Sequence, residues 1–141
     1  MTKIDFYILK NNATLNRATL ACRLAEKAYQ QQHHIYIHAD SQQDAQRLDD
    51  LLWTFNQGSF LPHEIIEANT PCTAPIKIGF AETVLDDYDV LINLGHEIPK
   101  HFSRFTRVAE LVEADEQARQ QARERFRFYR DRGYPLESHE L

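Results

Sequence analysis

The feature that most constrains the fold of this chain is an alternation of short apolar runs with segments of helical periodicity. The first run, IDFYIL (residues 4–9), precedes a segment (18–28) whose four alanines share one face of a helix. A second run, IYIHA (35–39), is rich in β-branched and aromatic residues and predicts a strand. Ser41 then has the side chain and position of an N-cap before a second helical segment.

The rest of the chain continues the alternation. Further strands are predicted at 76–80, 90–94 and 107–112, with a short helix within 98–105. Residues 55–75 carry one glycine and three prolines, so we expect mostly connection there. We see no repeat or second domain, and residues 1–141 predict a single α/β domain. Its sheet is expected to be Rossmann-like and mostly parallel, with helices on both faces.

A Rossmann-like order prompts a search for a nucleotide site, which needs glycines where the backbone approaches phosphate. The turn after the first strand reads LKNNATLN and contains no glycine, and no GxxxxGK[ST] motif occurs. The stretch DDYDVLINL (86–94) loosely resembles the acidic strand of an NTPase, but a core strand is the better interpretation. The domain therefore lacks a phosphate-binding glycine loop, and no cofactor is predicted.

Other chemistry is sparse. His34 and His38 would project from one face of a strand, but no cysteine or carboxylate lies at metal-ligand spacing, so no metal site is predicted. Cys22 and Cys72 are far apart and are interpreted as reduced thiols. No catalytic constellation is apparent. No apolar run reaches membrane-spanning length and the start lacks a signal-peptide pattern, so we expect a cytoplasmic protein without a membrane partner.

The charge of the chain is unevenly distributed. The net charge of −5 argues against a general nucleic-acid binder. Residues 119–132, however, hold six arginines against two acidic residues, a net of +4, whereas the remaining residues carry a net of −9. This basic segment lies in a predicted helix that begins after Asp115 and ends before Gly133 and Pro135.

The basic helix has a distinct arginine stripe. At about 100° per residue, four arginines fall within an arc of about 80° beside Phe126: Arg119, Arg123, Arg127 and Arg130. A solvated helix face is one interpretation. Like charges four residues apart destabilise a helix, however, and an anionic partner would relieve that cost. The partner could be a phosphate backbone or an acidic peptide, and Phe126 favours a peptide with an apolar anchor.

Several motifs resemble one known family along nearly the whole chain. They are the DFYIL opening, AQRLDDLLWTF (45–55), SFLPH (59–63), DVLINL (89–94) and ARERFRFYRDRGY (122–134). In this order and spacing they resemble the chi subunit of the bacterial DNA polymerase III holoenzyme. The resemblance implies a non-catalytic accessory subunit. Such a subunit pairs with the small psi subunit of the clamp-loader complex and binds the acidic C-terminal tail of the single-stranded DNA-binding protein, which ends in Pro-Phe. DNA would be engaged mainly indirectly.

The resemblance also implies site residues. The tail pocket falls on the arginine stripe and Phe126, and an apolar wall is expected from Trp53, Phe60 and Val112. The family pattern has lysine at 119 and 127 and tyrosine at 126, so a tyrosine hydroxyl contact is absent here. The psi contact is expected around Ile98, Phe102 and Phe105, which could equally be core residues. Direct binding of single-stranded DNA or a nucleotide on the basic helix is the alternative function.

Overall fold

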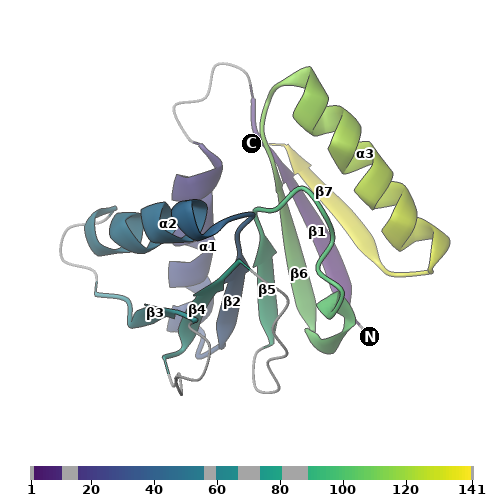
Figure 1. Cartoon of the computed structure of the whole chain (residues 1–141). Helices are drawn as coiled ribbons and strands as arrows, with labels where there is room; N and C mark the ends of the chain where they lie inside the picture. Colours follow the sequence, from purple (N-terminus) through teal and green to yellow (C-terminus); the bar gives the residue numbers. More distant parts are fainter. Residues whose placement is uncertain (1, 11–15, 56–59, 67–73, 81–88, 141) are drawn as a thin grey trace.

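The chain forms, in a computed structural model, a seven-stranded sheet with helices on both faces (Figure 1). The structure describes residues 2–10, 16–55, 60–66, 74–80 and 89–140. The strand order is β3-β4-β2-β5-β6-β1-β7, and every neighbouring pair is parallel. The elements are β1 (Lys3–Ile8), α1 (Arg17–Gln30), β2 (Ile35–His38), α2 (Gln42–Thr54), β3 (His63–Ile65), β4 (Ile76–Gly79), β5 (Val90–Asn93), η1 (Phe102–Arg104), β6 (Arg107–Val112), α3 (Glu116–Asp131) and β7 (Leu136–Glu140).

The helices bury one core on each side of the sheet. Helices α1 and α2 pack on one face over the centre and the β3 edge, whereas α3 packs on the opposite face over β6 and its neighbours (Figure 1). Strand β1 serves both cores because its side chains alternate: Phe6 points toward α3, and Tyr7 lies on the α1 side. This arrangement confirms the predicted Rossmann-like α/β architecture.

Local signals in the sequence account for the helix boundaries. The side chains of Asn16, Ser41 and Asp115 cap α1, α2 and α3, each accepting a hydrogen bond from a backbone N–H three residues later. Helix α3 ends where Gly133 takes a positive φ of 80°, a conformation that costs glycine little. The predicted caps at Ser41 and Asp115, and the stop at Gly133, are therefore confirmed.

Two strands were not predicted. Strand β3 lies within the segment expected to be mostly connection, and its three residues are too short to show an alternating pattern. Strand β7 has the sequence LESHE, which is too polar to resemble a core strand. It forms an edge of the sheet by pairing with β1 alone, and charged residues are typical of edge strands. The short helix expected within 98–105 is the 3-10 turn η1.

The cysteines and several predicted segments can be located in the fold or lie outside the described residues. Cys22 is a buried core residue, and burial raises the pKa of its thiol to about 12. Cys72, Ser59, part of the glycine-free turn (11–15) and part of the acidic stretch (86–88) lie outside the described residues. Within the described ranges, no helix has the length and apolar character needed to cross a membrane.

Candidate functional site

A pocket of about 260 Å³ lies between α3 and the carboxyl ends of β1, β6 and β7. Its floor is apolar: the ring centroids of Phe6 and Phe126 lie 5.5 Å apart at an angle of 57°, and buried Val112 lies beside them. Two arginines of α3 stand at its rim. Among the described residues, its lining is Phe6, Ile8, Val112, Arg119, Ala122, Arg123, Phe126, Ser138 and Glu140. The structure thus brings four of the predicted tail-binding residues into one cavity.

Arg119 is held between the pocket and the end of β1. Its Nη2 donates to the Leu9 carbonyl oxygen over 3.4 Å. Its Nε is buried and has no hydrogen-bond partner in the described part of the chain. Leaving a buried donor unpaired costs about 1–3 kcal/mol, so an acceptor that reached this atom would recover free energy. Arg119 therefore lines the pocket with a guanidinium group whose internal hydrogen bonding is incomplete among the described residues.

The other arginines of the stripe are accessible. Arg123 donates to Glu116 Oε1 at 3.2 Å, an exposed ion pair that a ligand carboxylate can replace at little cost. Among the described residues, the ion pair of Arg130 is an exposed contact with Asp131, at 3.5 Å. Arg127 is exposed and has no ion pair with any described residue. These side chains extend the positive rim of the pocket along α3.

Arg125 differs from the stripe because it lies inside the protein. Its Nε donates to Glu110 Oε1 at 3.1 Å, and its Nη1 donates to the His96 carbonyl oxygen at 3.2 Å. The fully buried Glu110 also accepts a 2.7 Å hydrogen bond from the Tyr129 hydroxyl and two from the Asn93 amide. Burial raises the pKa of Glu110, and Arg125, Tyr129 and Asn93 partly offset this shift. The cluster fixes which side of α3 faces the sheet, and so which arginines face outward.

Comparison with known proteins identifies the family. The model of the family described as "DNA polymerase III chi subunit, HolC" matches residues 1–137. The chain belongs to this chi family. Proteins named DNA polymerase III subunit chi from Pseudomonas aeruginosa and Haemophilus influenzae are 42% and 34% identical to it, over 100% and 94% of this chain and 98% and 92% of theirs. The Escherichia coli protein of that name is 28% identical over 96% of each chain.

The fold of this chi-family chain also occurs in a larger protein. A solved structure of T4 UvsW superposes with a TM-score of 0.71 over 99% of the chain, at 10% sequence identity. The chain corresponds to only 41% of UvsW. At this identity the likeness concerns the fold alone.

Trp53 and Phe60, expected to form the apolar wall of the tail site, lie away from the pocket that Arg119 and Arg123 line. Their rings contact each other with centroids 5.5 Å apart. Neither ring lines the pocket that contains Arg119 and Arg123, which we call the arginine pocket. Trp53 belongs to α2, which packs on β3 and β4 at the opposite edge of the sheet and on the opposite face from α3 (Figure 1). Sequence motifs could not show this because they do not report which sheet face a helix covers. The two side chains are 55% and 67% exposed.

The residues expected to contact psi are mostly internal. Phe102 is buried against Phe128, Tyr129 and Tyr134, with ring centroids 5.2–5.9 Å away. Phe105 is buried and stacks on Tyr36. Ile98 is partly buried and lines, with Phe102, an open groove of about 680 Å³ beside α3. The core interpretation therefore describes the two phenylalanines, and the psi contact at this segment stays a prediction.

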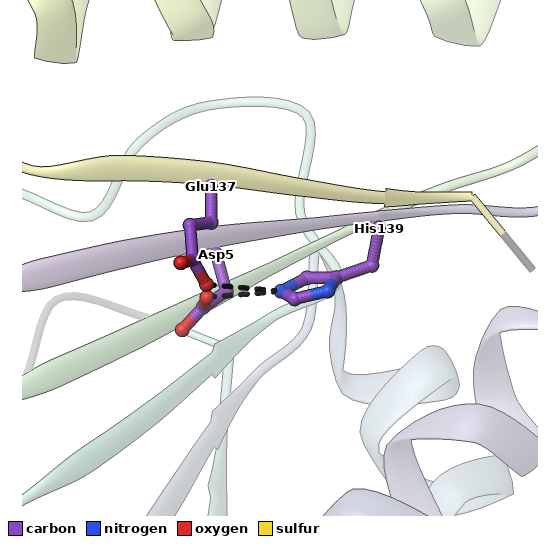
Figure 2. A group of neighbouring side chains, drawn as sticks. All are labelled: Asp5, Glu137 and His139. Atoms are coloured by element: carbon purple, nitrogen blue, oxygen red, sulfur yellow. Dashed lines mark hydrogen bonds and ion pairs between the residues drawn. The ribbon is translucent and has the colours of Figure 1, made fainter.

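One group of potential metal ligands exists among the described residues: Asp5, Glu137 and His139 (Figure 2). His139 Nε2 lies 3.1 Å from Asp5 Oδ1 and 3.7 Å from Glu137 Oε2. The carboxylates already have cationic partners, because Arg107 contacts Asp5 at 2.9 Å and Lys3 contacts Glu137 at 3.2 Å. The group is an ion-pair network that joins β7 to β1.

Five of the nine described lining residues were not predicted from the sequence, and four of these five come from β1 and β7. Ser138 and Glu140 belong to β7, and Phe6 and Ile8 to β1, so only the fold brings them to α3. The register pairs Phe6 with Ser138 and Ile8 with Glu140. The one available signal was the alternation of residues 136, 138 and 140, which is weak in so polar a segment.

Proposed function

We propose that this chain is a non-catalytic accessory subunit of DNA polymerase III that acts in the cytoplasm. In this role it binds the acidic C-terminal tail of the single-stranded DNA-binding protein, and the tail occupies the pocket lined by Arg119 and Arg123. The observation that carries the proposal is the combination of an apolar floor with Arg119 and Arg123 at its rim. A basic surface alone would suit any polyanion. An apolar cavity of side-chain size suits a ligand that ends in an aromatic residue.

Each part of such a tail has a partner. The terminal phenylalanine would pack between Phe126 and Val112, removing apolar surface from water. Its terminal carboxylate would accept hydrogen bonds from the guanidinium groups of Arg123 and Arg119, which both line the pocket. Acidic residues preceding the terminus would lie near Arg127 and Arg130, which are exposed along α3.

Three peptides test this proposal on the purified protein. A fluorescent acidic peptide ending in Pro-Phe is expected to bind with a roughly micromolar Kd that rises with salt. A peptide with an amidated C-terminus should bind at least about tenfold more weakly, because it lacks the terminal charge. A peptide lacking the last phenylalanine should show a similar loss. Equal binding of all three peptides would contradict the proposed pocket.

A second contact is proposed for the psi subunit. The Trp53–Phe60 surface presents two large exposed aromatic side chains, whereas Phe102 and Phe105 are enclosed by the core. Exposed aromatic clusters are typical of the centres of protein interfaces. We therefore place psi on the Trp53–Phe60 surface in preference to the segment around Ile98.

The psi contact can be tested independently of the tail. Trp53→Ala and Phe60→Ala should each abolish co-purification with psi and leave tail-peptide binding unchanged. Arg123→Ala should do the reverse. Normal psi binding by both aromatic variants would contradict this placement and favour the segment around Ile98 as the psi contact.

Direct binding of single-stranded DNA is the second candidate, since exposed arginines beside Phe126 could contact phosphates and a base. A nucleotide is less well supported. Rossmann-like sheets bind nucleotides at the carboxyl ends of their strands. The pocket there is lined by the carboxylates of Asp40, Asp44 and Glu113 and by two arginines, Arg17 and Arg47, which pair with Glu113 and Asp44, so its described lining is net negative. Competition between the tail peptide and a short oligonucleotide distinguishes the candidates: displacement of the peptide only by unlabelled peptide supports tail binding.

A further inference from the structure

The wall of the arginine pocket that faces α3 comes from β7. Ser138 and Glu140 line the cavity across from Arg119 and Arg123. Their positions follow from the register of β7 on β1, which sets Ser138 beside Phe6 and Glu140 beside Ile8. A carboxylate and a hydroxyl therefore belong to a cavity whose opposite rim is cationic.

Glu140 is not a counter-ion to these arginines. Within the described residues it forms no hydrogen bond or ion pair, and its side chain is exposed. The neighbouring acidic residue of β7, Glu137, contrasts with it because Glu137 contacts Lys3 at 3.2 Å in the network with Asp5 and His139 (Figure 2). The pocket thus contains an unpaired negative charge and the hydroxyl of Ser138.

We propose that Glu140, together with Ser138, is a specificity determinant that admits a peptide terminus and rejects a nucleic-acid backbone. This inference rests on the proposed tail-binding function. A phosphodiester backbone carries a negative charge at every unit and offers no hydrogen-bond donor, so Glu140 would repel it without compensation. A peptide tail carries its terminal carboxylate at one end, has its acidic side chains farther along α3 near Arg127 and Arg130, and offers backbone N–H donors behind the terminus. Arg119 and Arg123 would take the carboxylate, while Ser138 Oγ and Glu140 accept from the N–H groups.

A repulsive carboxylate beside the arginine stripe would help the protein to discriminate between single-stranded DNA and peptide. Four exposed or partly exposed arginines follow one side of α3, and a stripe of this kind attracts single-stranded DNA and peptide alike. Discrimination between two anions requires an element that is unfavourable for one of them. Glu140 supplies that element at the rim of the cavity.

The test compares Glu140→Gln with Glu137→Gln, which removes the same charge from the same strand outside the pocket. Anisotropy titrations at about 50 mM salt measure the Kd of the Pro-Phe tail peptide and of a short oligothymidylate. For Glu140→Gln we expect at least about fivefold tighter oligonucleotide binding and a peptide Kd within about twofold of wild type. Glu137→Gln should change neither Kd by more than about twofold, and Ser138→Ala should weaken only the peptide, by about threefold.

The possible outcomes distinguish the specificity role of Glu140 from tail binding in the pocket. If Glu140→Gln tightens both ligands equally, or neither, the specificity role is overturned while tail binding stands. If Glu137→Gln matches Glu140→Gln, the effect is one of net charge, and the specificity role is likewise overturned. If the wild-type protein binds no tail peptide, the proposed function fails, and this inference fails with it. Unchanged thermal unfolding of each variant verifies that folding is intact.

Discussion

Arg125 Nε donates to Glu110 Oε1 over 3.1 Å in the interior between α3 and the sheet. This single pair separates the roles of the arginines on α3. Arg125 is buried in the core, whereas Arg119 and Arg123 line the pocket and Arg127 is exposed to solvent. The buried pair therefore orients the surface that the proposed function needs.

Removing the carboxylate of Glu110 should be costly for folding. Glu110→Ala leaves the Arg125 charge buried without its partner, and such changes destabilise proteins by about 3–5 kcal/mol. Urea unfolding measures the loss. The double variant Glu110→Leu with Arg125→Met removes both charges and should be clearly more stable than Glu110→Ala. A loss below about 1 kcal/mol for Glu110→Ala would contradict this role for the pair.

Stability at acidic pH should depend on Asp5. Burial alone raises the pKa of Asp5, but hydrogen bonds from Arg107 and His139 outweigh it and hold the pKa below the ordinary value. A carboxyl with a lowered folded pKa stabilises the protein above its unfolded pKa, which is about 3.9. This contribution is lost as pH falls through the lower, folded pKa.

Urea midpoints measured from neutral pH down through this window test the role of Asp5. Wild type should lose more stability than Asp5→Asn as the pH falls below about 4. Glu124→Gln, which removes an exposed carboxylate of α3, is the matched control and should follow the wild-type curve. Parallel curves for wild type and Asp5→Asn would show that the network does not stabilise the fold in this way.

Phe126 should matter for the shape of the pocket. Phe126→Ala removes the ring that closes the floor beside Phe6, and we expect at least about tenfold weaker binding of the tail peptide. Phe126→Tyr keeps the ring and should bind within about threefold of wild type. Phe128→Ala is the control, because Phe128 lies on the groove side of α3. Equal losses for the two alanine variants would indicate general damage to α3.

The fold was largely predictable because its strands and caps have local signals. The runs at 35–39 and 90–94 are almost entirely apolar, as is typical of strands covered on both faces. Ser41 and Asp115 have the side chains that cap helices. The arginine stripe followed from helical angles alone. Arg125 could not be distinguished from its neighbours, because its partner Glu110 comes from β6.

The rest of the site depends on contacts between distant segments. Glu140 reaches the pocket through a polar edge strand, and Trp53 lies away from it because α2 covers the other face of the sheet. Neither position is encoded in local periodicity. Motif order linked Trp53 to the pocket, and the topology of the sheet separates them.

Tail binding in the pocket is tested most directly by titrating the Pro-Phe tail peptide on Arg123→Ala and, in parallel, on Arg47→Ala. Both variants remove one exposed arginine, but Arg47 lies on α2 and pairs weakly with Asp44 at 3.8 Å. If the tail binds in this pocket, Arg123→Ala should bind it at least about tenfold more weakly, and Arg47→Ala should change the Kd by no more than about twofold. Indistinguishable curves for the two variants would contradict the assignment of the pocket as the peptide site.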